Sequence, residues 1–282
     1  MARKVGVIGA GLMGGEIALV FALAGHEVLL NDRDKESLDR ALARLRALME
    51  KGVSRGFFKV EEIDPTLSRI KPALDLAAFA DREFVTEAVF EQEQIKTDLL
   101  GRLAAVVSQD CIIASNTSTI PISTLAGALP AERRSRFIGT HYFSPVSRMK
   151  LVEVIPGFDT SEETMDAAMA IMTEIGKTPI RVKDVAGFAV NRMLHAFMIE
   201  AVKLVEEGVA SPEDLDTACR LGLGHPIGPF ALMDAVTSSL CVQAQEIMQE
   251  AYGERFRPPA LLKQRVRAGY GGGKGKPGWF AA

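Results

Sequence analysis

The sequence predicts an α/β fold with a mostly parallel sheet, followed by an all-helical domain. Short apolar segments rich in β-branched residues alternate with helical patterns in the first part of the chain, which is typical of βαβ units. A glycine-rich turn joins the first expected strand to the first expected helix. After Asp184 the strand pattern ends and helical periodicity takes over. We therefore expect a sheet domain over residues 1–184 and a helical domain over residues 185–282.

Several segments have the length and composition of buried strands. They are Lys4–Ile8, Glu27–Asn31, Phe84–Ala88, Cys111–Ser115, Phe137–Thr140, Leu151–Ile155 and Thr178–Val182. An apolar helix, Met13–Ala24, is expected between the first two strands, with Gly25 as its end. From Lys35 to Ala78 the pattern is helical with a break at residues 51–54, so we expect a helical hairpin that leaves the sheet.

Capping residues mark the later helices. Thr160 begins a capping-box pattern, and Gly176 is the expected end of the helix that follows. Asn191–Glu207 is apolar nearly all round, which fits a buried helix or a subunit interface. Ser211 has the sequence context of an N-cap, and the chain closes with a glycine-rich tail.

The composition is that of an ordinary globular protein. Hydrophobic residues make up 48% and charged residues 24% of the chain, and the net charge is −3. With no long basic run, neither nucleic acid nor an anionic membrane is an expected partner. Cys111, Cys219 and Cys241 have neither metal-site nor disulfide spacing, so no metal is expected. No signal peptide or spanning segment is recognisable, and we expect a cytoplasmic protein.

The glycine-rich turn has the spacing of a dinucleotide-binding motif. Its sequence is Gly9-Ala-Gly11-Leu12-Met13-Gly14, directly after an expected strand and at the start of a helix. The first glycine permits the tight turn, the second allows a pyrophosphate to approach, and the third allows close helix–strand packing. The helix N-terminus offers N–H groups to the phosphates. This context predicts a Rossmann-type fold, against the alternative of a glycine turn without a ligand.

An acidic residue follows the second expected strand. Asp32 lies 23 residues after Gly9, where a carboxylate binds ribose hydroxyls and repels a 2′-phosphate. The neighbouring Arg33 weakens that preference slightly. The sequence therefore predicts NAD rather than NADP as the cofactor.

A histidine and a glutamate occupy neighbouring strands. His141 lies at the end of one expected strand and Glu153 inside the next. A neutral imidazole accepts a hydroxyl proton, and a carboxylate on its other nitrogen orients the ring. The alternative is a structural histidine beside a half-buried glutamate, but a nearby dinucleotide motif favours alcohol oxidation by hydride transfer.

Two polar segments are weaker candidates for substrate binding. Ser118 ends the Ser115-Asn-Thr-Ser segment after a strand, where a turn leading to Pro121 is an equally simple explanation. Asn191 begins a helix and fits an N-cap or a packing amide as well as a substrate donor. Basic residues also recur along the expected hairpin, at Arg44, Arg46, Lys51, Arg55 and Lys59. That stripe fits a solvated face or a clamp for coenzyme A phosphates.

Taken together, these motifs resemble the 3-hydroxyacyl-CoA dehydrogenase family, including the short bacterial 3-hydroxybutyryl-CoA dehydrogenases. The resemblance covers nearly the full length. Its segments are Gly9–Gly14, Glu87–Glu91 with Lys96, Ala114–Ser118, His141–Pro145, Met149–Val154, Val182–Phe188 with Asn191 and Arg192, Glu206–Ala210 and Gly224–Pro229. Departures from the family pattern include Ser144, Ala186 and the C-terminal tail.

The resemblance implies an NAD-binding Rossmann domain and a helical domain that forms a homodimer. It implies His141 as the base, Glu153 as its partner, and Ser118 and Asn191 as groups that bind the substrate oxygens. It places Arg55 and Lys51 at the coenzyme A. The implied cofactor contacts, besides the glycine motif and Asp32, are Ala88, Glu91, Lys96, Asn116, Ser118, Ser144 and Lys274.

The expected function is NAD-dependent interconversion of L-3-hydroxyacyl-CoA and 3-ketoacyl-CoA. One alternative is a related dehydrogenase that acts on a 3-hydroxy acid or a carnitine-like alcohol without coenzyme A. Another is a non-catalytic NAD(H)-binding structural or regulatory protein, against which the presence of both His141 and Glu153 argues. The 6-phosphogluconate-like dehydrogenases share a similar opening motif but use a catalytic lysine in a glycine-rich helix, which we do not find.

Overall fold

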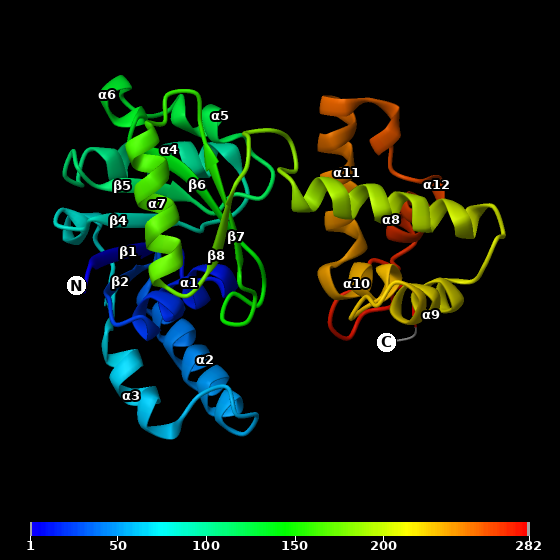
Figure 1. Cartoon of the computed structure of the whole chain (residues 1–282), viewed down its shortest axis with the longest axis horizontal. Helices are drawn as coiled ribbons and strands as arrows, with labels where there is room; N and C mark the ends of the chain where they lie inside the picture. Colours follow the sequence, from blue (N-terminus) through cyan, green and yellow to red (C-terminus); the bar gives the residue numbers. More distant parts are fainter. Residues whose placement is uncertain (1, 281–282) are drawn as a thin grey trace. The chain divides into compact units, whose positions relative to one another are not determined.

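The computed structural model of the chain describes residues 2–280. The chain divides into two compact units, residues 1–185 and residues 186–282. In Figure 1 the first is coloured from blue to green and the second from yellow to red. No helix among residues 2–280 is both long and apolar enough to cross a membrane.

The first unit is built on one eight-stranded sheet with the order β3-β2-β1-β4-β5-β6-β7-β8. All neighbouring strands are parallel except β6 and β7, which are antiparallel. The strands are β1 Lys4–Ile8, β2 Glu27–Asn31, β3 Ile70–Ala73, β4 Phe84–Glu87, β5 Ile112–Ser115, β6 Phe137–Tyr142, β7 Leu151–Pro156 and β8 Thr178–Arg181. The predicted mostly parallel α/β fold is therefore confirmed, and each predicted strand is present with ends shifted by at most two residues.

The strand order places a ligand site at one edge of the sheet. The chain runs outward from β1 to β2 and β3, then returns to the other side of β1 with β4. Ligands of open α/β sheets bind at the carboxyl ends of the strands where the order reverses. Here that position lies beyond the ends of β1 and β4.

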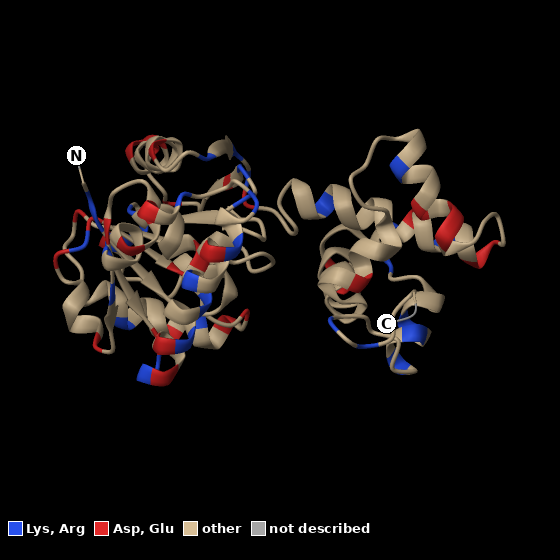
Figure 2. Ribbon diagram, turned by 90° about the horizontal axis from the view of Figure 1, so that it is seen from below, with Lys and Arg blue, Asp and Glu red and all other residues tan. Residues whose placement is uncertain are grey.

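The helices of this unit include the predicted hairpin. They are α1 Leu12–Leu23, α2 Lys35–Val53, α3 Val60–Ser68, α4 Glu93–Ala104, α5 Ile122–Ala126, α6 Ala131–Arg134 and α7 Glu162–Glu174. Figure 1 shows α2 and α3 projecting away from the sheet. Buried residues of α1 such as Ile17, Leu19 and Phe21 pack in the same core as strand residues such as Val5 and Leu30. Figure 2 shows acidic and basic residues interspersed over this unit.

The prediction was wrong in two places in this unit. Residues 70–73, expected to be helical, form the edge strand β3, followed by a 3₁₀ turn at Leu76–Phe79. Pro72 obscured the strand, but an edge strand tolerates proline because one side of its backbone needs no partner. The N-cap of α7 is Ser161, whose side chain accepts from the Thr164 amide, rather than Thr160. The Thr160 hydroxyl instead donates to the Phe137 carbonyl.

The second unit is helical. Its helices are α8 Val190–Glu206, α9 Pro212–Gly222, α10 Pro229–Val236, α11 Ser238–Tyr252 and α12 Ala260–Arg267, with a 3₁₀ turn at Glu254–Phe256. Met198, Phe230 and Trp279 belong to its core. Ser211 caps α9 as predicted, because its side chain accepts from the Asp214 amide.

Two predictions about this unit are refined by the structure. α8 is not buried all round, since Met193 is 67% exposed. The glycine-rich tail is tied to α10 through Asp234, whose carboxylate accepts from the amides of Trp279 and Phe280. A side chain at Gly278 would lie 2.1 Å from that carboxylate, so the close approach requires glycine there.

Candidate active site

The glycine turn after β1 has the shape that a dinucleotide requires. Gly9 has a φ of +99°, and a Cβ on Gly14 would lie 1.8 Å from the Gly9 carbonyl oxygen. A Cβ on Gly11 would meet nothing within 4 Å. Thus the first and third glycines are needed for the turn itself, while the space over the second is open for a phosphate group.

The N-terminus of α1 is available to an anion. Gly11 is the N-cap, and no side chain caps the helix among the described residues. Leu12 and Met13 begin the helix, so their N–H groups lie in the first turn, which has no intrahelical acceptors for them. Together with the open space at Gly11, this end of α1 fits the pyrophosphate of a dinucleotide.

Asp32 and Arg44 brace the same turn. The Asp32 Oδ2 atom accepts from the Ala10 amide at 2.7 Å. The Arg44 guanidinium donates to the carbonyls of Ala10 and Gly11 at 3.0 and 2.8 Å. Asp32 therefore holds the turn in the protein alone, and its predicted contact with a ribose stays a prediction.

A histidine, a glutamate and a serine form a hydrogen-bonded chain. His141 on β6 lies opposite Glu153 on β7 in the antiparallel register, and its Nδ1 atom is 2.8 Å from Glu153 Oε2. Its Nε2 atom is 3.1 Å from the Ser118 hydroxyl. Glu153 is fully buried and His141 is 4% exposed. A buried carboxylate at Nδ1 favours the tautomer with a proton there, which leaves Nε2 as an acceptor facing Ser118.

Glu91 fixes the segment that carries Ser118. One carboxylate oxygen accepts from the backbone amides of Ser118 and Thr119 and from the Thr117 hydroxyl, at 2.6–2.9 Å. The other lies 3.3 Å from Lys96 Nζ. Burial opposes ionisation of Glu91, but Lys96 and these hydrogen bonds outweigh it and lower the pKa of the carboxyl below its ordinary value.

Lys96 is a buried structural cation in this arrangement. Its side chain is 1% exposed and donates to Glu87 Oε1 at 2.7 Å. Glu87 is fully buried at the end of β4 and also accepts from the Ser115 hydroxyl and the Val89 amide. The pair thereby connects the ends of β4 and β5 to α4, where the sequence predicted cofactor contacts for Ala88, Glu91 and Lys96.

The other predicted contacts on the sheet unit lie in two places. The Asn116 Oδ1 atom accepts from the Tyr142 amide at 3.0 Å, which places it between the ends of β5 and β6, and Ser144 follows in the loop after β6. Lys51 and Arg55 lie at the end of α2 and just after it. Neither forms an ion pair with any of residues 2–280, whereas Arg46 pairs with Asp64.

Asn191 and Lys274 belong to the helical unit. Asn191 is the second residue of α8, and the N-cap is Ala189, so the N-cap alternative for Asn191 is wrong. Lys274 lies in the tail between two glycines with φ of +96° and +70°. Their predicted contacts with substrate and cofactor stay predictions.

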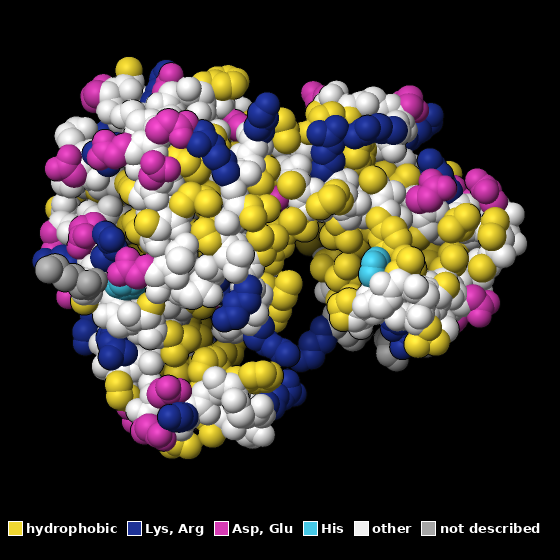
Figure 3. All heavy atoms as spheres, in the orientation of Figure 1, with side chains coloured by type: hydrophobic (Ala, Val, Ile, Leu, Met, Phe, Trp, Pro, Cys, Tyr) yellow, Lys and Arg dark blue, Asp and Glu magenta, His cyan; other side chains and the backbone are white. Residues whose placement is uncertain are grey.

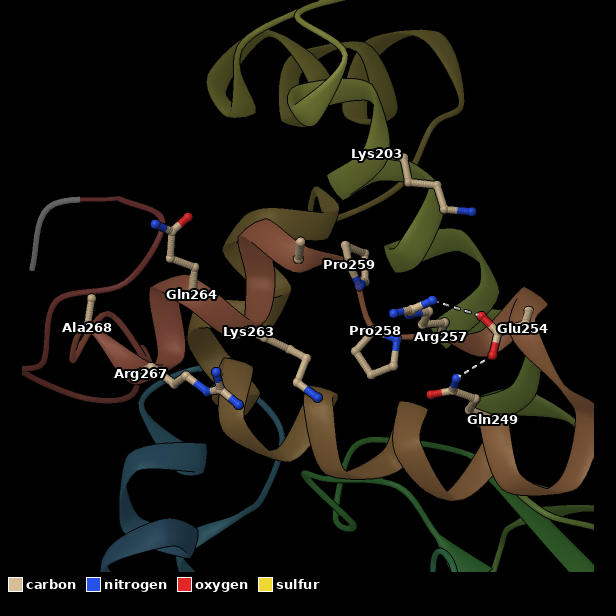
Figure 4. Close-up of a pocket in the computed structure, with 11 residues that line it drawn as sticks. Lys203, Gln249, Glu254, Arg257, Pro258, Pro259, Lys263, Gln264, Arg267 and Ala268 are labelled. Atoms are coloured by element: carbon tan, nitrogen blue, oxygen red, sulfur yellow. Dashed lines mark hydrogen bonds and ion pairs between the residues drawn. The ribbon is translucent and has the colours of Figure 1, made fainter.

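A cavity of about 1210 Å³ in the helical unit is lined by none of the predicted site residues. Figure 4 shows Lys203, Lys263 and Arg267 lining it, together with Arg257. Arg257 pairs with Glu254, and Lys263 pairs with Glu246, so part of this positive charge is neutralised within the unit.

Several buried polar residues near the predicted site were missed. Glu87, Glu16 and Lys177 are all less than a tenth exposed and bond to loops at the strand ends. Glu16 was the most accessible to sequence reasoning, because a carboxylate inside the apolar α1 pattern requires a partner. The other two are recognisable only from the tertiary contacts. No group of His, Cys, Asp and Glu suited to a metal occurs among residues 2–280.

Comparison with known proteins identifies the family. Residues 4–185 match the family model for the 3-hydroxyacyl-CoA dehydrogenase NAD-binding domain, and residues 187–282 match that for its C-terminal domain. The chain is 41% identical to a probable 3-hydroxybutyryl-CoA dehydrogenase of Deinococcus radiodurans, covering 98% of this chain and 99% of that protein. It is 36% identical to the mitochondrial hydroxyacyl-coenzyme A dehydrogenase of Sus scrofa, covering 99% and 91% of the two chains.

A solved structure is similarly close. The (S)-3-hydroxybutyryl-CoA dehydrogenase of Ralstonia eutropha matches with a TM-score of 0.94 and 35% identity, over 100% of this chain and 99% of that one. The two family domains together cover nearly all of the sequence, and the first of them is an NAD-binding domain. The chain therefore belongs to the 3-hydroxyacyl-CoA dehydrogenase family, and NAD is its cofactor.

Proposed function

We propose that this enzyme interconverts L-3-hydroxyacyl-CoA and 3-ketoacyl-CoA esters. The observation that carries the proposal is the chain of hydrogen bonds from Glu153 through His141 to Ser118, at the carboxyl edge of the sheet that also holds the glycine turn. An imidazole with one nitrogen held by a buried carboxylate can exchange a proton with an alcohol through its other nitrogen.

The proposed chemistry separates a proton from a hydride. Bound NAD would supply the acceptor for the hydride from C3 of the substrate. The Nε2 atom of His141 accepts the proton of the C3 hydroxyl, and Glu153 stabilises the imidazolium that results. Ser118, which already lies 3.1 Å from Nε2, donates to the C3 oxygen as its carbonyl character develops. In the reverse direction His141 returns the proton to that oxygen.

The binding roles are part of the same proposal. The glycine turn and Asp32 would hold the adenosine half of the cofactor, and the nicotinamide half would be held by Ala88, Glu91, Lys96, Asn116 and Ser144, with Lys274 of the tail as a further contact. Asn191 binds the substrate oxygens with Ser118. Lys51 and Arg55, which have no ion-pair partner among residues 2–280, bind the coenzyme A phosphates.

Substrate preference separates this proposal from an activity on free hydroxy acids. We expect NADH oxidation to saturate with acetoacetyl-CoA and to remain unsaturated with free acetoacetate at equal concentrations. The double variant Lys51→Gln/Arg55→Gln should raise KM for acetoacetyl-CoA about tenfold, because exposed charge pairs contribute up to about 1 kcal/mol each. Its kcat should change little.

A matched control removes two other charges from the same helix. Lys35 and Arg40 form exposed pairs with Asp39 and Glu36 at the start of α2, and Lys35→Gln/Arg40→Gln should leave KM unchanged. Equal rates with acetoacetate and acetoacetyl-CoA would favour the non-CoA substrate. Tight NADH binding without turnover of any acyl-CoA would favour the non-catalytic alternative.

We also propose that the chain forms a homodimer through the helical unit. Large apolar side chains stay exposed there, including Met193, Val209, Leu221, Leu223 and Leu240, of which Leu221 is 83% exposed. Figure 3 shows hydrophobic side chains gathered on the visible face of this unit. Apolar patches of this kind mark protein interfaces.

Light scattering should give twice the chain mass of 30.5 kDa. Leu221→Glu/Leu223→Glu should shift that mass toward one chain, and a monomeric parent protein would contradict the proposal. The cytoplasmic location expected from the sequence also remains a proposal, supported by three buried free cysteines.

A further inference from the structure

The loop that follows the histidine strand is held by a buried acid from the cofactor helix. Eight residues, 143–150, connect β6 to β7, although antiparallel neighbours need only a two-residue turn. The Oε2 atom of Glu16, on α1, accepts from the Ser147 amide at 2.9 Å and from the Ser147 hydroxyl at 3.0 Å. Glu16 is 3% exposed. A residue two positions after Gly14 is thereby tied to the loop that begins two residues after His141.

A buried cation holds the same loop from another side. Lys177 lies just before β8 and is 7% exposed. Its ammonium donates to the Val146 carbonyl and, at 2.8 Å, to the Met149 carbonyl. Burial lowers the pKa of Lys177 to about 8, Lys150 acts in the same direction, and Glu16 opposes it. Two groups that lose hydration on burial therefore bond to three residues of this loop, Val146, Ser147 and Met149.

Simple loop closure does not require these charges. Burying an ionised side chain costs free energy unless it is paired and hydrogen-bonded, and apolar residues close loops without that cost. The charged contacts add a defined loop conformation, because each of them bonds to a particular backbone group of the loop. The loop carries Ser144, and it continues β6, on which His141 lies.

We propose that Glu16 and Lys177 are positioning residues, which hold the loop after β6 in register with α1 so that the acid–base pair keeps a fixed place relative to the cofactor turn. This inference rests on the proposed function. Neither residue touches the reacting atoms. They act on the position of His141 relative to the cofactor, because a small displacement of a catalytic group lowers the reaction rate.

The contact can be tested by removing each side of it. Glu16→Leu removes the acceptor, Ser147→Ala removes one of the two donors, and Glu16→Gln keeps an acceptor of the same shape. We expect kcat for acetoacetyl-CoA to fall about tenfold in Glu16→Leu and about threefold in Ser147→Ala, with KM changed less than twofold and Glu16→Gln close to the parent protein. The double variant Glu16→Leu/Ser147→Ala should be no slower than Glu16→Leu, because both changes break the same contact.

Two further measurements distinguish positioning from a structural role. Hydrogen exchange should show faster exchange in residues 143–150 of Glu16→Leu, with unchanged exchange in α4. Glu163→Gln is the matched control, since Glu163 pairs with Arg136 on an exposed face and should alter neither readout.

Failure of the positioning inference and failure of the proposed function give different results in these experiments. A lower thermal midpoint with unchanged kcat in the folded Glu16→Leu protein would overturn the inference, as would multiplicative losses in the double variant. Inactivity of the parent protein toward every acyl-CoA would instead overturn the proposed function itself.

Discussion

Replacing His141 by glutamine is expected to lower turnover by about two to four orders of magnitude while NADH still binds. The amide of a glutamine side chain lies near the position of the Nε2 atom and so keeps a polar partner for Ser118. This amide does not accept a proton near neutral pH, so the C3 hydroxyl loses its general base. Steady-state rates with acetoacetyl-CoA and fluorescence titration with NADH measure the two effects separately.

The partner residue and an exposed histidine complete the experiment. Glu153→Gln keeps the shape of the buried side chain but removes the charge that stabilises the imidazolium, so it should slow turnover without loss of fold. His225→Gln changes an exposed histidine of the helical unit and should leave the rate unaltered. Near-normal turnover in His141→Gln would refute the assignment of the base. Unfolding of Glu153→Gln would show that the glutamate is structural.

Local patterns in the sequence were sufficient to predict every strand of the sheet except β3, and the glycine turn. The turn was predictable because its local backbone conformation requires glycine. Gly9 has a positive φ, and a side chain on Gly14 would collide with the Gly9 carbonyl. The contact between His141 and Glu153 was predictable because each residue lies on a strong strand pattern and the two strands are consecutive. Their catalytic roles remain predictions that the variants above test.

What the sequence could not supply depends on distant contacts. β3 was missed because its proline is acceptable only at a sheet edge, and edge position is a property of the whole topology. Glu16 and Ser147 are 131 positions apart, and nothing in either local pattern indicates the other. Lys96 was assigned to the cofactor by resemblance, whereas the structure shows its contacts with Glu87 and Glu91.

Replacing Lys96 by methionine is therefore expected to destabilise the sheet unit by about 3–5 kcal/mol, the usual cost of removing one partner of a buried ion pair. Glu87 is fully buried, and after the substitution its charge keeps only the Ser115 hydroxyl and the Val89 amide as partners. Denaturant unfolding measures the loss. Lys71→Met on the exposed edge strand is the matched control and should change stability by less than about 0.5 kcal/mol.

A second substitution separates the structural role of Lys96 from a role in cofactor binding. Glu87→Gln/Lys96→Met removes both charges, so at least half of the stability lost in Lys96→Met should return, because the uncompensated carboxylate is gone. If the ammonium instead serves mainly to contact the cofactor, Lys96→Met would weaken NADH binding in a protein of unchanged stability, and the double variant would recover nothing. The structural account requires the opposite pattern, because the charge of Lys96 is directed at Glu87 and at the carboxylate of Glu91 that orients Ser118.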